Sequence, residues 1–337
     1  MRIARAATKQ TARTKARAGG PRLAGRVAIV AGATRGAGRG IAWALGEAGA
    51  TVYCTGRSVP GAPSPYGRPE TIDETAALVS QAGGQGIAVR VDHTVEGEIA
   101  ALMARVTREQ GRLDLLVNSA AGEDPSLAWR TPFVALDADA IQMTLQHTVV
   151  SHLITARHAA PLLTRRTGLI VEVTEGDTLT LGGVSVVGCL VKTMQKVLAF
   201  VLAQELKNRQ IAVIAVTPGF LRSESMLDHF KVTEATWRDG GKKDAHFLES
   251  ETPRFLGRGI ARLAADPRVL DRSGALTSSW ALSREFGVVD ADGSRPDWGA
   301  HIADLGREFD WMRRGLETEV AWLTTIAERA AEYAMTR

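Results

Sequence analysis

A run of glycines between an apolar strand and a helical stretch limits the folds open to this chain. The segment AIVAGATRGAGRGIAWAL places Gly32, Gly36 and Gly38 directly after the apolar run VAIVA. Glycine permits a tight turn and a close approach of backbone to a pyrophosphate, while a helix beginning near Gly38 would offer unpaired N–H groups and a partial positive charge. No Gly-Lys-Ser/Thr follows, which excludes a Walker loop. The pattern predicts that the turn from Gly32 to Gly40 binds a dinucleotide.

Short apolar segments alternate with helical stretches from Arg26 onward. Several of the segments are continuous apolar runs, which is typical of parallel strands covered by helices on both faces. The expected strands are Val27–Ala31, Thr51–Thr55, Ile87–Val91, Leu113–Asn118, Leu169–Thr174, Ile211–Thr217 and Ala275–Trp280. The sequence therefore predicts an α/β protein with a doubly wound, Rossmann-like parallel sheet in a single domain.

Four segments depart from this alternation. Residues 1–22 are rich in Ala, Thr, Arg and Lys, and we expect them to form a disordered basic tail. Within a domain of residues 23–298, residues 59–69 form a Pro/Gly-rich insertion, and the polar stretch 220–255 is expected to form a lid over the site. Residues 299–337 are expected to form a C-terminal helical extension, because apolar side chains recur there at steps of three and four.

The charge of the chain is unevenly distributed. Seven of its 41 Lys and Arg residues lie in the first 22 positions, which hold no acid, so the formal charge of +4 becomes −3 for the remainder. The folded body therefore gives no electrostatic reason to bind nucleic acid. No apolar run approaches the roughly 20 residues of a membrane span, and the two cysteines, Cys54 and Cys189, lack metal-ligand spacing. We expect a cytoplasmic protein that binds a small-molecule substrate and no metal.

The end of the second expected strand bears on which dinucleotide is bound. An NAD-binding site would place an acidic residue there, but the strand ends in TVYCTGRS. Arg57 and Ser58 stand where a 2′-phosphate would lie, and Arg35 in the glycine turn adds a second guanidinium. These residues predict NADP(H) as the cofactor.

From about Arg26 to Trp280 the sequence resembles the short-chain dehydrogenase/reductase family. The glycine motif agrees except that Ala31 replaces a threonine, and three further motifs follow in the family's order: Val91-Asp92-His93, Asn118-Ser119-Ala120-Ala121 and Pro218-Gly219. The resemblance implies an oxidoreductase that forms homodimers or homotetramers through the long helices expected at 138–163 and 191–207. Together with the charge argument it implies cofactor contacts at Gly32, Thr34, Arg35, Gly36, Ala37, Gly38, Arg57, Ser58, Asp92, His93, Asn118, Ala120, Lys192, Pro218, Gly219, Leu221 and Ser223.

The catalytic positions depart from the family pattern. The family uses a Tyr-x-x-x-Lys pair for proton transfer, with a serine about 13 residues upstream and an asparagine on the preceding helix. Lys192 matches the lysine, but Gly188 stands at the tyrosine position. The chain has three tyrosines, and none lies between the fifth and sixth expected strands. The usual proton donor is therefore missing.

Glu175 stands at the serine position, and Gln146, followed by His147, falls near the asparagine position. A partly buried carboxyl group at the end of a parallel strand can act as a general acid or base, and the neighbouring Glu172 and Asp177 would raise its pKa further. The alternative is that Glu175 merely pairs with Lys192 or faces solvent. The catalytic candidates are Glu175, Lys192, Gln146 and His147.

Three functions stay open on this reasoning. The favoured one is an NADP(H)-dependent reductase or dehydrogenase that acts on a small organic molecule with a non-standard proton donor. The second is a non-redox enzyme on the same scaffold, of the cyclase, isomerase, dehydratase or aldolase type, that uses Glu175. The third is an NADP(H)-binding pseudoenzyme, because a fold and a cofactor site do not by themselves fix a reaction.

Overall fold

The computed structural model describes residues 23–62, 64, 67–121, 132–177 and 185–308. Its seven strands form one parallel sheet in the order β3-β2-β1-β4-β5-β6-β7. The strands are β1 (Val27–Ala31), β2 (Thr51–Gly56), β3 (Gln85–Arg90), β4 (Leu115–Asn118), β5 (Leu169–Val173), β6 (Ala212–Thr217) and β7 (Leu276–Ser278). The predicted doubly wound parallel sheet is confirmed.

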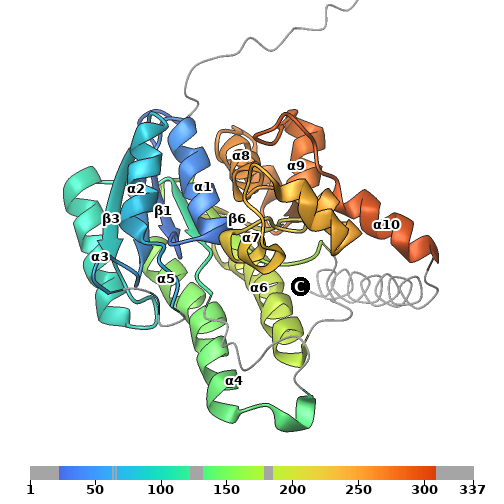
Figure 1. Ribbon diagram of the computed structural model, residues 1–337. Coiled ribbons are helices and arrows are strands. Elements are labelled where there is room, and N and C mark those ends of the chain that lie inside the picture. Colours follow the sequence, from blue (N-terminus) through green and yellow to red (C-terminus); the bar gives the residue numbers. More distant parts are fainter. Residues whose placement is uncertain (1–22, 63, 65–66, 122–131, 178–184, 309–337) are drawn as a thin grey trace, which may run out of the picture.

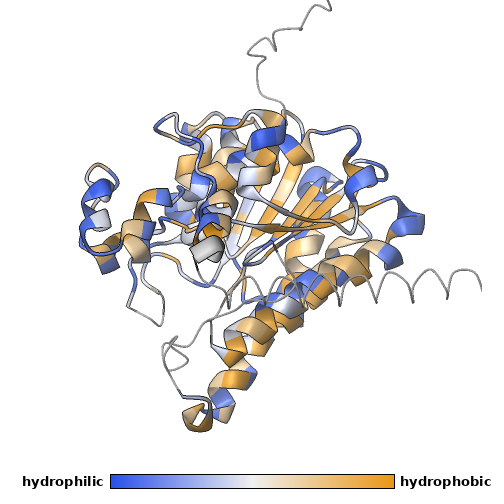
Figure 2. Cartoon of the chain, turned by 90° about the vertical axis from the view of Figure 1, so that its right-hand side faces the viewer, coloured by the Kyte–Doolittle hydropathy of each residue, from blue (hydrophilic) through white to orange (hydrophobic). Residues whose placement is uncertain are grey.

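Helices cover both faces of this sheet (Figure 1). On one face lie α1 (Gly36–Glu47), α2 (Ile72–Gln81) and α8 (Pro253–Ala264), and on the other lie α3 (Glu96–Gln110), α5 (Ser151–Ala159) and α6 (Val186–Glu205). Alternate residues of β1 enter the two cores, so that Val30 packs toward the first layer and Ile29 toward the second. Figure 2 shows the resulting apolar strands in the interior.

A π-helical turn divides the long helix that the sequence predicts at 138–163. Helix α4 (Ala138–Leu145) runs into the turn η3 (Gln146–Val150) and then into α5, which ends at Ala159. Within this stretch the Thr148 hydroxyl donates to the Thr144 carbonyl at 2.5 Å. Single π turns of this kind occur often at functional sites, because the extra residue changes the direction of the side chains that follow.

Two element boundaries differ from those predicted, because a serine residue caps a helix at each of them. The last strand was expected to reach Trp280, but it ends at Ser278, whose hydroxyl accepts a hydrogen bond from the Ala281 N–H and begins α9 (Ser279–Phe286). Similarly, α6 begins before residue 191, because Ser185 accepts from the Gly188 N–H at 3.0 Å. The remaining elements are η2 (Phe133–Ala135), η4 (Lys207–Arg209), α7 (Glu224–Phe230), η5 (Trp237–Lys242), η6 (Ala245–Glu249), η7 (Val269–Arg272) and α10 (Trp298–Glu308).

The order of the strands positions the site. Strand β1 lies between β2 and β4, and the connections from β1 and β4 leave toward opposite layers, which makes their carboxyl ends the switch point where open α/β sheets bind ligands in a crevice. There Ala31 pairs in register with Thr55 of β2 and Asn118 of β4, and Asn118 pairs with Glu172 of β5. Helix α10 forms the first part of the predicted C-terminal extension. The rest of that extension and the predicted tail 1–22 lie outside the described residues.

Candidate dinucleotide and active site

Two glycines of the turn after β1 have no room for a side chain. Gly32 has φ +84°, and a Cβ atom there would lie 2.6 Å from the Cα of Ala120. A Cβ atom on Gly38 would lie 2.1 Å from the carbonyl oxygen of Gly32. The turn is tied to β2 as well, because the N–H groups of Gly32 and Ala33 both donate to the Thr55 carbonyl. The close packing that the sequence motif predicts is therefore present.

An anion lies at the N-terminus of α1, and the protein itself supplies it. The cap residue Arg35 makes no capping hydrogen bond with its side chain, and the first turn holds no acidic residue. Instead the Gly36 N–H donates to Glu224 Oε2 at 2.8 Å, and Glu224 Oε1 lies 3.7 Å from Arg39 Nε. This carboxylate from α7 stands in for the oxygen atoms of a phosphate, the group that helix N-termini commonly bind. The turn thus fits the pyrophosphate of a dinucleotide.

A second contact joins α7 to the insertion after β2. Arg68 donates to Asp228 Oδ2 at 2.9 Å and also pairs with Glu70. Glu224 and Asp228 lie one helical turn apart, so α7 presents two carboxylates toward the glycine turn and the insertion. Ser223, a predicted cofactor contact, occupies the N-cap position of this helix beside Gly36, without a side-chain capping hydrogen bond.

Four predicted site residues lie together at the ends of β2 and β3. Arg57 Nη1 donates to His147 Nε2 at 3.0 Å and lies 3.9 Å from Asp92 Oδ2. Burial opposes ionisation of Asp92, but hydrogen bonds from Thr94 and the charge of Arg57 outweigh it and lower the pKa of that carboxyl. Ser58 is buried next to Arg57. His147, predicted as a catalytic residue, therefore contacts the arginine predicted to select the cofactor.

His93 is buried with both ring nitrogens engaged. The Thr55 hydroxyl donates to the Val30 carbonyl, so it accepts from His93 Nε2 at 2.8 Å, while Nδ1 lies 3.0 Å from the Thr155 hydroxyl. Burial, with a contribution from His152, lowers the pKa of His93 to about 4. The ring is thus neutral and held in place, and a contact between His93 and the cofactor would use its backbone.

Asn118 belongs to a polar cluster inside the sheet that sequence reasoning missed. Its amide donates to Glu172 Oε1 at 2.6 Å, and Glu172 Oε2 lies 2.7 Å from His152 Nδ1. His152 Nε2 in turn lies 2.9 Å from the carbonyl oxygen of Ala120. Glu172 was predicted to act on Glu175 through repulsion between carboxylates, but its side chain is buried against His152. The sequence signal was present, because LIVEV places an acid within an otherwise apolar strand.

The predicted catalytic residues of β5 and α6 lie at the same edge of the sheet. Gly188 and Lys192 are one turn apart on α6, and the Thr174 hydroxyl donates to the Lys192 carbonyl at 3.0 Å. Glu175, half-buried, directly follows Thr174. A Cβ atom added to Gly188 would meet only the Ser185 hydroxyl, at 3.0 Å, within the described residues. Gln146 begins the π turn on the neighbouring helix.

A second missed acid, Glu251, lies behind Pro218 and Gly219. Its Oε2 accepts from the Gly219 N–H at 3.0 Å and from the Ser279 hydroxyl at 2.5 Å. Its backbone pairs with Leu221, another predicted cofactor contact. Complete burial raises the pKa of Glu251 to about 8, so the carboxyl is largely protonated at neutral pH. Oε2 accepts both hydrogen bonds, and Oε1 is buried without a hydrogen-bond partner among the described residues.

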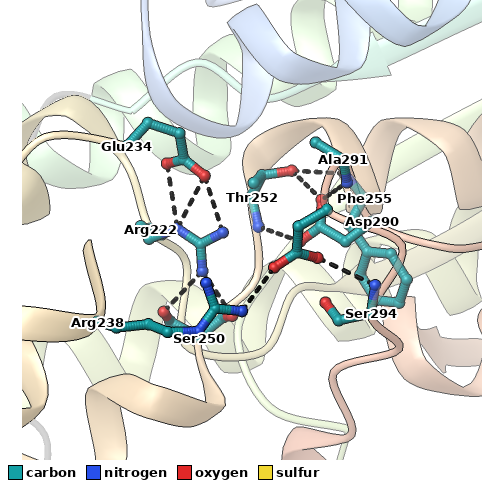
Figure 3. A network of polar contacts seen from close by, with 10 residues as sticks. Arg222, Glu234, Arg238, Ser250, Thr252, Phe255, Asp290, Ala291 and Ser294 are labelled. Carbon is teal, nitrogen blue, oxygen red and sulfur yellow. Dashed lines mark hydrogen bonds and ion pairs between the residues drawn. The ribbon is translucent and has the colours of Figure 1, made fainter. Parts of the chain in front are cut away.

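The segment 220–255 folds around an aromatic cluster, which consists of Phe220, Phe230, Trp237 and Phe247. Arg222 is buried in this segment, and Figure 3 shows its guanidinium bound to Glu234 and to the backbone and hydroxyl of Ser250. Its Cζ also lies 3.9 Å from the centre of the Trp237 ring. Asp290 binds Thr252 next to this group. The predicted lid is thus a packed unit held by a buried arginine.

The fold and the site together define a dinucleotide-binding protein of the Rossmann type. Residues 26–232 match the family model for short chain dehydrogenases. The chain is 34% identical over 286 residues to mouse dehydrogenase/reductase SDR family member 1, covering 80% of this chain and 85% of the relative, and 33% identical to the human protein, covering 80% and 84%. A short chain dehydrogenase from Mycobacterium thermoresistibile shares the fold, with a TM-score of 0.68 at 20% identity over 82% of this chain and 92% of that one.

The chain therefore belongs to the short-chain dehydrogenase/reductase family, which confirms the resemblance in its motifs. Membership makes it an oxidoreductase-type protein. Proteins of this family generally use NAD(H) or NADP(H), bind a small-molecule substrate and form oligomers.

The raised pKa of Glu251 predicts a pH effect on stability. A carboxyl with a pKa near 4.5 when unfolded and about 8 when folded binds more protons in the folded state between these values. Its contribution is complete below pH 4.5 and is lost as the pH rises through 8. We expect the free energy of unfolding to fall with rising pH in this window by up to about 1.4 kcal/mol per pH unit from this group.

Chemical denaturation from pH 5 to 9 measures this effect in the wild type, Glu251→Gln and Glu249→Gln. In Glu251→Gln the new amide oxygen can accept both hydrogen bonds without ionising, so the profile of this variant should be flatter than that of the wild type. The exposed Glu249 provides the matched control, and its variant should keep the wild-type slope. Parallel profiles for the wild type and Glu251→Gln would contradict the assignment.

Proposed function

We propose that this chain is an NADP(H)-dependent reductase or dehydrogenase of small organic molecules that uses a proton partner other than tyrosine. The observation that carries the proposal is the anion site at the N-terminus of α1, where the Gly36 N–H already binds a carboxylate. Arg57 and Ser58 lie at the end of β2, where the ribose of the adenosine half would be bound. The guanidinium favours a 2′-phosphate over free hydroxyls at that point.

Different residues around this crevice bind the cofactor and transfer the proton. The cofactor, when bound, supplies or accepts a hydride. We assign Lys192 of α6 to binding of the nicotinamide ribose, and Glu175, just past the end of β5, to proton exchange with the substrate. Gly188 has no side chain where the family has its tyrosine, and among the described residues only Ser185 lies close to where that side chain would begin. The substrate or water can occupy this space. An iminium or activated alkene needs less acid assistance than a ketone, and we propose substrates of that kind.

A change in cofactor preference tests the role of Arg57. In Arg57→Ala we expect NADP(H) to bind at least about tenfold more weakly while NAD(H) changes little, because a charge-assisted contact to the 2′-phosphate is lost. In Glu224→Gln both dinucleotides should bind more tightly by a similar factor, since the competing carboxylate is neutralised. Isothermal titration calorimetry with all four dinucleotides measures both effects. An unchanged preference in Arg57→Ala would remove Arg57 from the site, and a wild-type preference for NAD(H) would reject NADP(H).

Glu175→Gln separates the proposed reaction from a non-redox one. With a panel of ketones, iminium ions and activated alkenes, we expect substrate-dependent oxidation of NADPH by the wild type, followed by absorbance, and a loss of at least about 100-fold in kcat for Glu175→Gln. The exposed Glu205→Gln, at the C-terminal end of α6, serves as control and should keep most of the rate. Full activity in Glu175→Gln would exclude Glu175 as the proton partner.

A non-redox enzyme on the same scaffold is the second candidate, and the glycine at position 188 favours it. Product formation that continues with NADP⁺ or without cofactor, and stops in Glu175→Gln, would support this function over the first. The dinucleotide would then have a structural role. No turnover by either route, with NADP(H) bound, would favour a pseudoenzyme.

We further propose that a second copy of the chain covers an apolar face of α6. Within the described residues, one helix, α6, is long and apolar enough to cross a membrane, and a third of its most apolar stretch is buried. Its exposed apolar residues are Val186, Leu190, Met194, Val197, Phe200 and Val201, and Val150 and Leu153 of the neighbouring helix are also exposed. A patch of this kind on a monomer marks an association surface.

Light scattering after size-exclusion chromatography tests this surface. We expect a homodimer or homotetramer for the wild type and a smaller species for Leu190→Glu combined with Val197→Glu, because both charges would be buried in the interface. Glu substitution of the exposed Val95, which directly precedes α3, is the control and should leave the mass unchanged. A monomeric wild type at micromolar concentration would overturn the assignment.

A further inference from the structure

An acidic side chain lies at the centre of the sheet. Glu172 is the fourth residue of β5, pairs in register with Asn118 of β4 and Ala215 of β6, and is fully buried. An isolated carboxylate in such a place costs several kcal/mol, so it must be neutralised or paired. Asn118 supplies one hydrogen bond to Glu172 Oε1, and the other oxygen faces His152 at 2.7 Å.

The hydrogen-bond geometry fixes how many protons this pair carries. The Ala120 carbonyl can only accept, so His152 Nε2, 2.9 Å away, bears a hydrogen. The contact between His152 Nδ1 and Glu172 Oε2 needs a hydrogen as well, because two lone pairs at 2.7 Å would repel. That hydrogen lies on the imidazolium or on the carboxyl group. In both cases the pair holds one proton beyond neutral histidine and carboxylate, and its net charge is zero.

The pair of His152 and Glu172 is also connected to the glycine turn, through the backbone segment that directly follows β4. His152 Nε2 holds the Ala120 carbonyl, and the Cα of Ala120 is the atom that a Cβ on Gly32 would approach to 2.6 Å. Asn118 Nδ2 also lies 3.3 Å from the His152 carbonyl. A shift of Ala120 therefore moves the wall of the turn. The chain of contacts runs from the interior of β5 to the surface that would face the cofactor.

We propose that His152 and Glu172 are positioning residues of the dinucleotide site: a buried pair sharing one proton, which holds the segment from Asn118 to Ala120 against the glycine turn. This rests on the proposed cofactor function for its effect on binding, but not for the state of the pair itself. Neither residue touches the cofactor on this view. They act through the Ala120 carbonyl and the Asn118 amide.

The groups around the pair are compatible with a permanently shared proton. His93 contacts the Thr155 hydroxyl on α5, three residues after His152. Its lowered pKa of about 4 keeps His93 neutral at physiological pH. Asp92, the charged neighbour of His93, is directed to Thr94 and Arg57. Asn118 is neutral and donates to the pair. The groups nearest to the pair are therefore neutral or directed away from it.

Nuclear magnetic resonance of the wild-type protein tests the proton count directly. With 15N-labelled histidine and 13C-labelled glutamate carboxyl groups, we expect a slowly exchanging proton in the bond between His152 and Glu172, and a hydrogen on His152 Nε2, unchanged from pH 6 to 9. His158, which pairs with Glu96 on the surface, is the reference in the same spectrum. An unprotonated Nδ1 next to an ionised Glu172 would overturn the proposal.

Two substitutions of Glu172 then test whether the pair positions the cofactor site or only fills the interior. In Glu172→Gln every hydrogen bond can be kept, because the new amide oxygen accepts from Asn118 and the amide N–H donates to a neutral His152. NADP(H) affinity should stay within about twofold while the shared proton disappears. In Glu172→Leu both His152 Nδ1 and the Asn118 amide lose their partner, and we expect affinity to fall at least about tenfold.

Thermal unfolding and circular dichroism monitor the fold of each variant, and Glu96→Gln, which disrupts a surface His–Glu pair, is the matched control with wild-type affinity. Wild-type affinity in a folded Glu172→Leu protein would overturn the positioning role. If Glu172→Leu does not fold, the Glu172→Gln result decides: a tenfold loss there would contradict the hydrogen-bond account. Failure of wild type to bind either dinucleotide would reject the proposed function and leave the proton count intact.

Discussion

The close approach of two backbone segments, the turn after β1 and the end of β4, is the constraint on which the site depends. Gly32 and Ala120 come so near that any side chain on Gly32 would collide with the β4 backbone. The contact brings the two strands together where their connections diverge to opposite helical layers. The N–H group of Gly36, in the first turn of α1, lies next to this contact and binds Glu224. An anion site at that point follows from the chain direction and from the absence of a Cβ atom.

Buried acids around this crevice are neutralised in different ways. Glu172 is joined to a histidine and an asparagine, whereas the Glu251 carboxyl binds neutral donors, Gly219 and Ser279, and is protonated through burial. Glu224, which is half-buried, accepts a hydrogen bond from the N-terminus of α1. Glu172 binds the Asn118 amide at the end of β4, and Glu251 binds the Gly219 N–H just after β6. Each contact stabilises backbone next to the candidate cofactor site. The polar groups thus position backbone on both sides of the crevice without placing a net charge inside the sheet.

The sequence allowed the sheet to be predicted more closely than the site. Apolar runs such as Val27–Ala31 form strands because burial on two faces is a local requirement that the residues themselves express. The boundary of β7 was predicted too late, since the apolar pattern did not reveal that Ser278 caps a helix. The contacts of Glu224, Glu251 and His152 were missed because their partners lie 188, 32 and 20 residues away. No periodicity in one sequence reports such contacts, although an acid inside LIVEV already required a partner.

Gly188 illustrates how local structure limits the chemistry at the candidate catalytic edge. Its N–H caps α6 through Ser185, and the same hydroxyl lies where a Cβ on residue 188 would come within 3.0 Å. A serine cap tolerates a side chain at this third helical position, and a Cβ atom here would meet little else among the described residues, so the glycine leaves space next to the N-terminus of α6. Lys192 lies one turn further on the same helix, with its carbonyl bound by Thr174, next to Glu175. Lys192 thus lies on the helix that this cap begins, and Glu175 lies just past the end of the neighbouring strand β5.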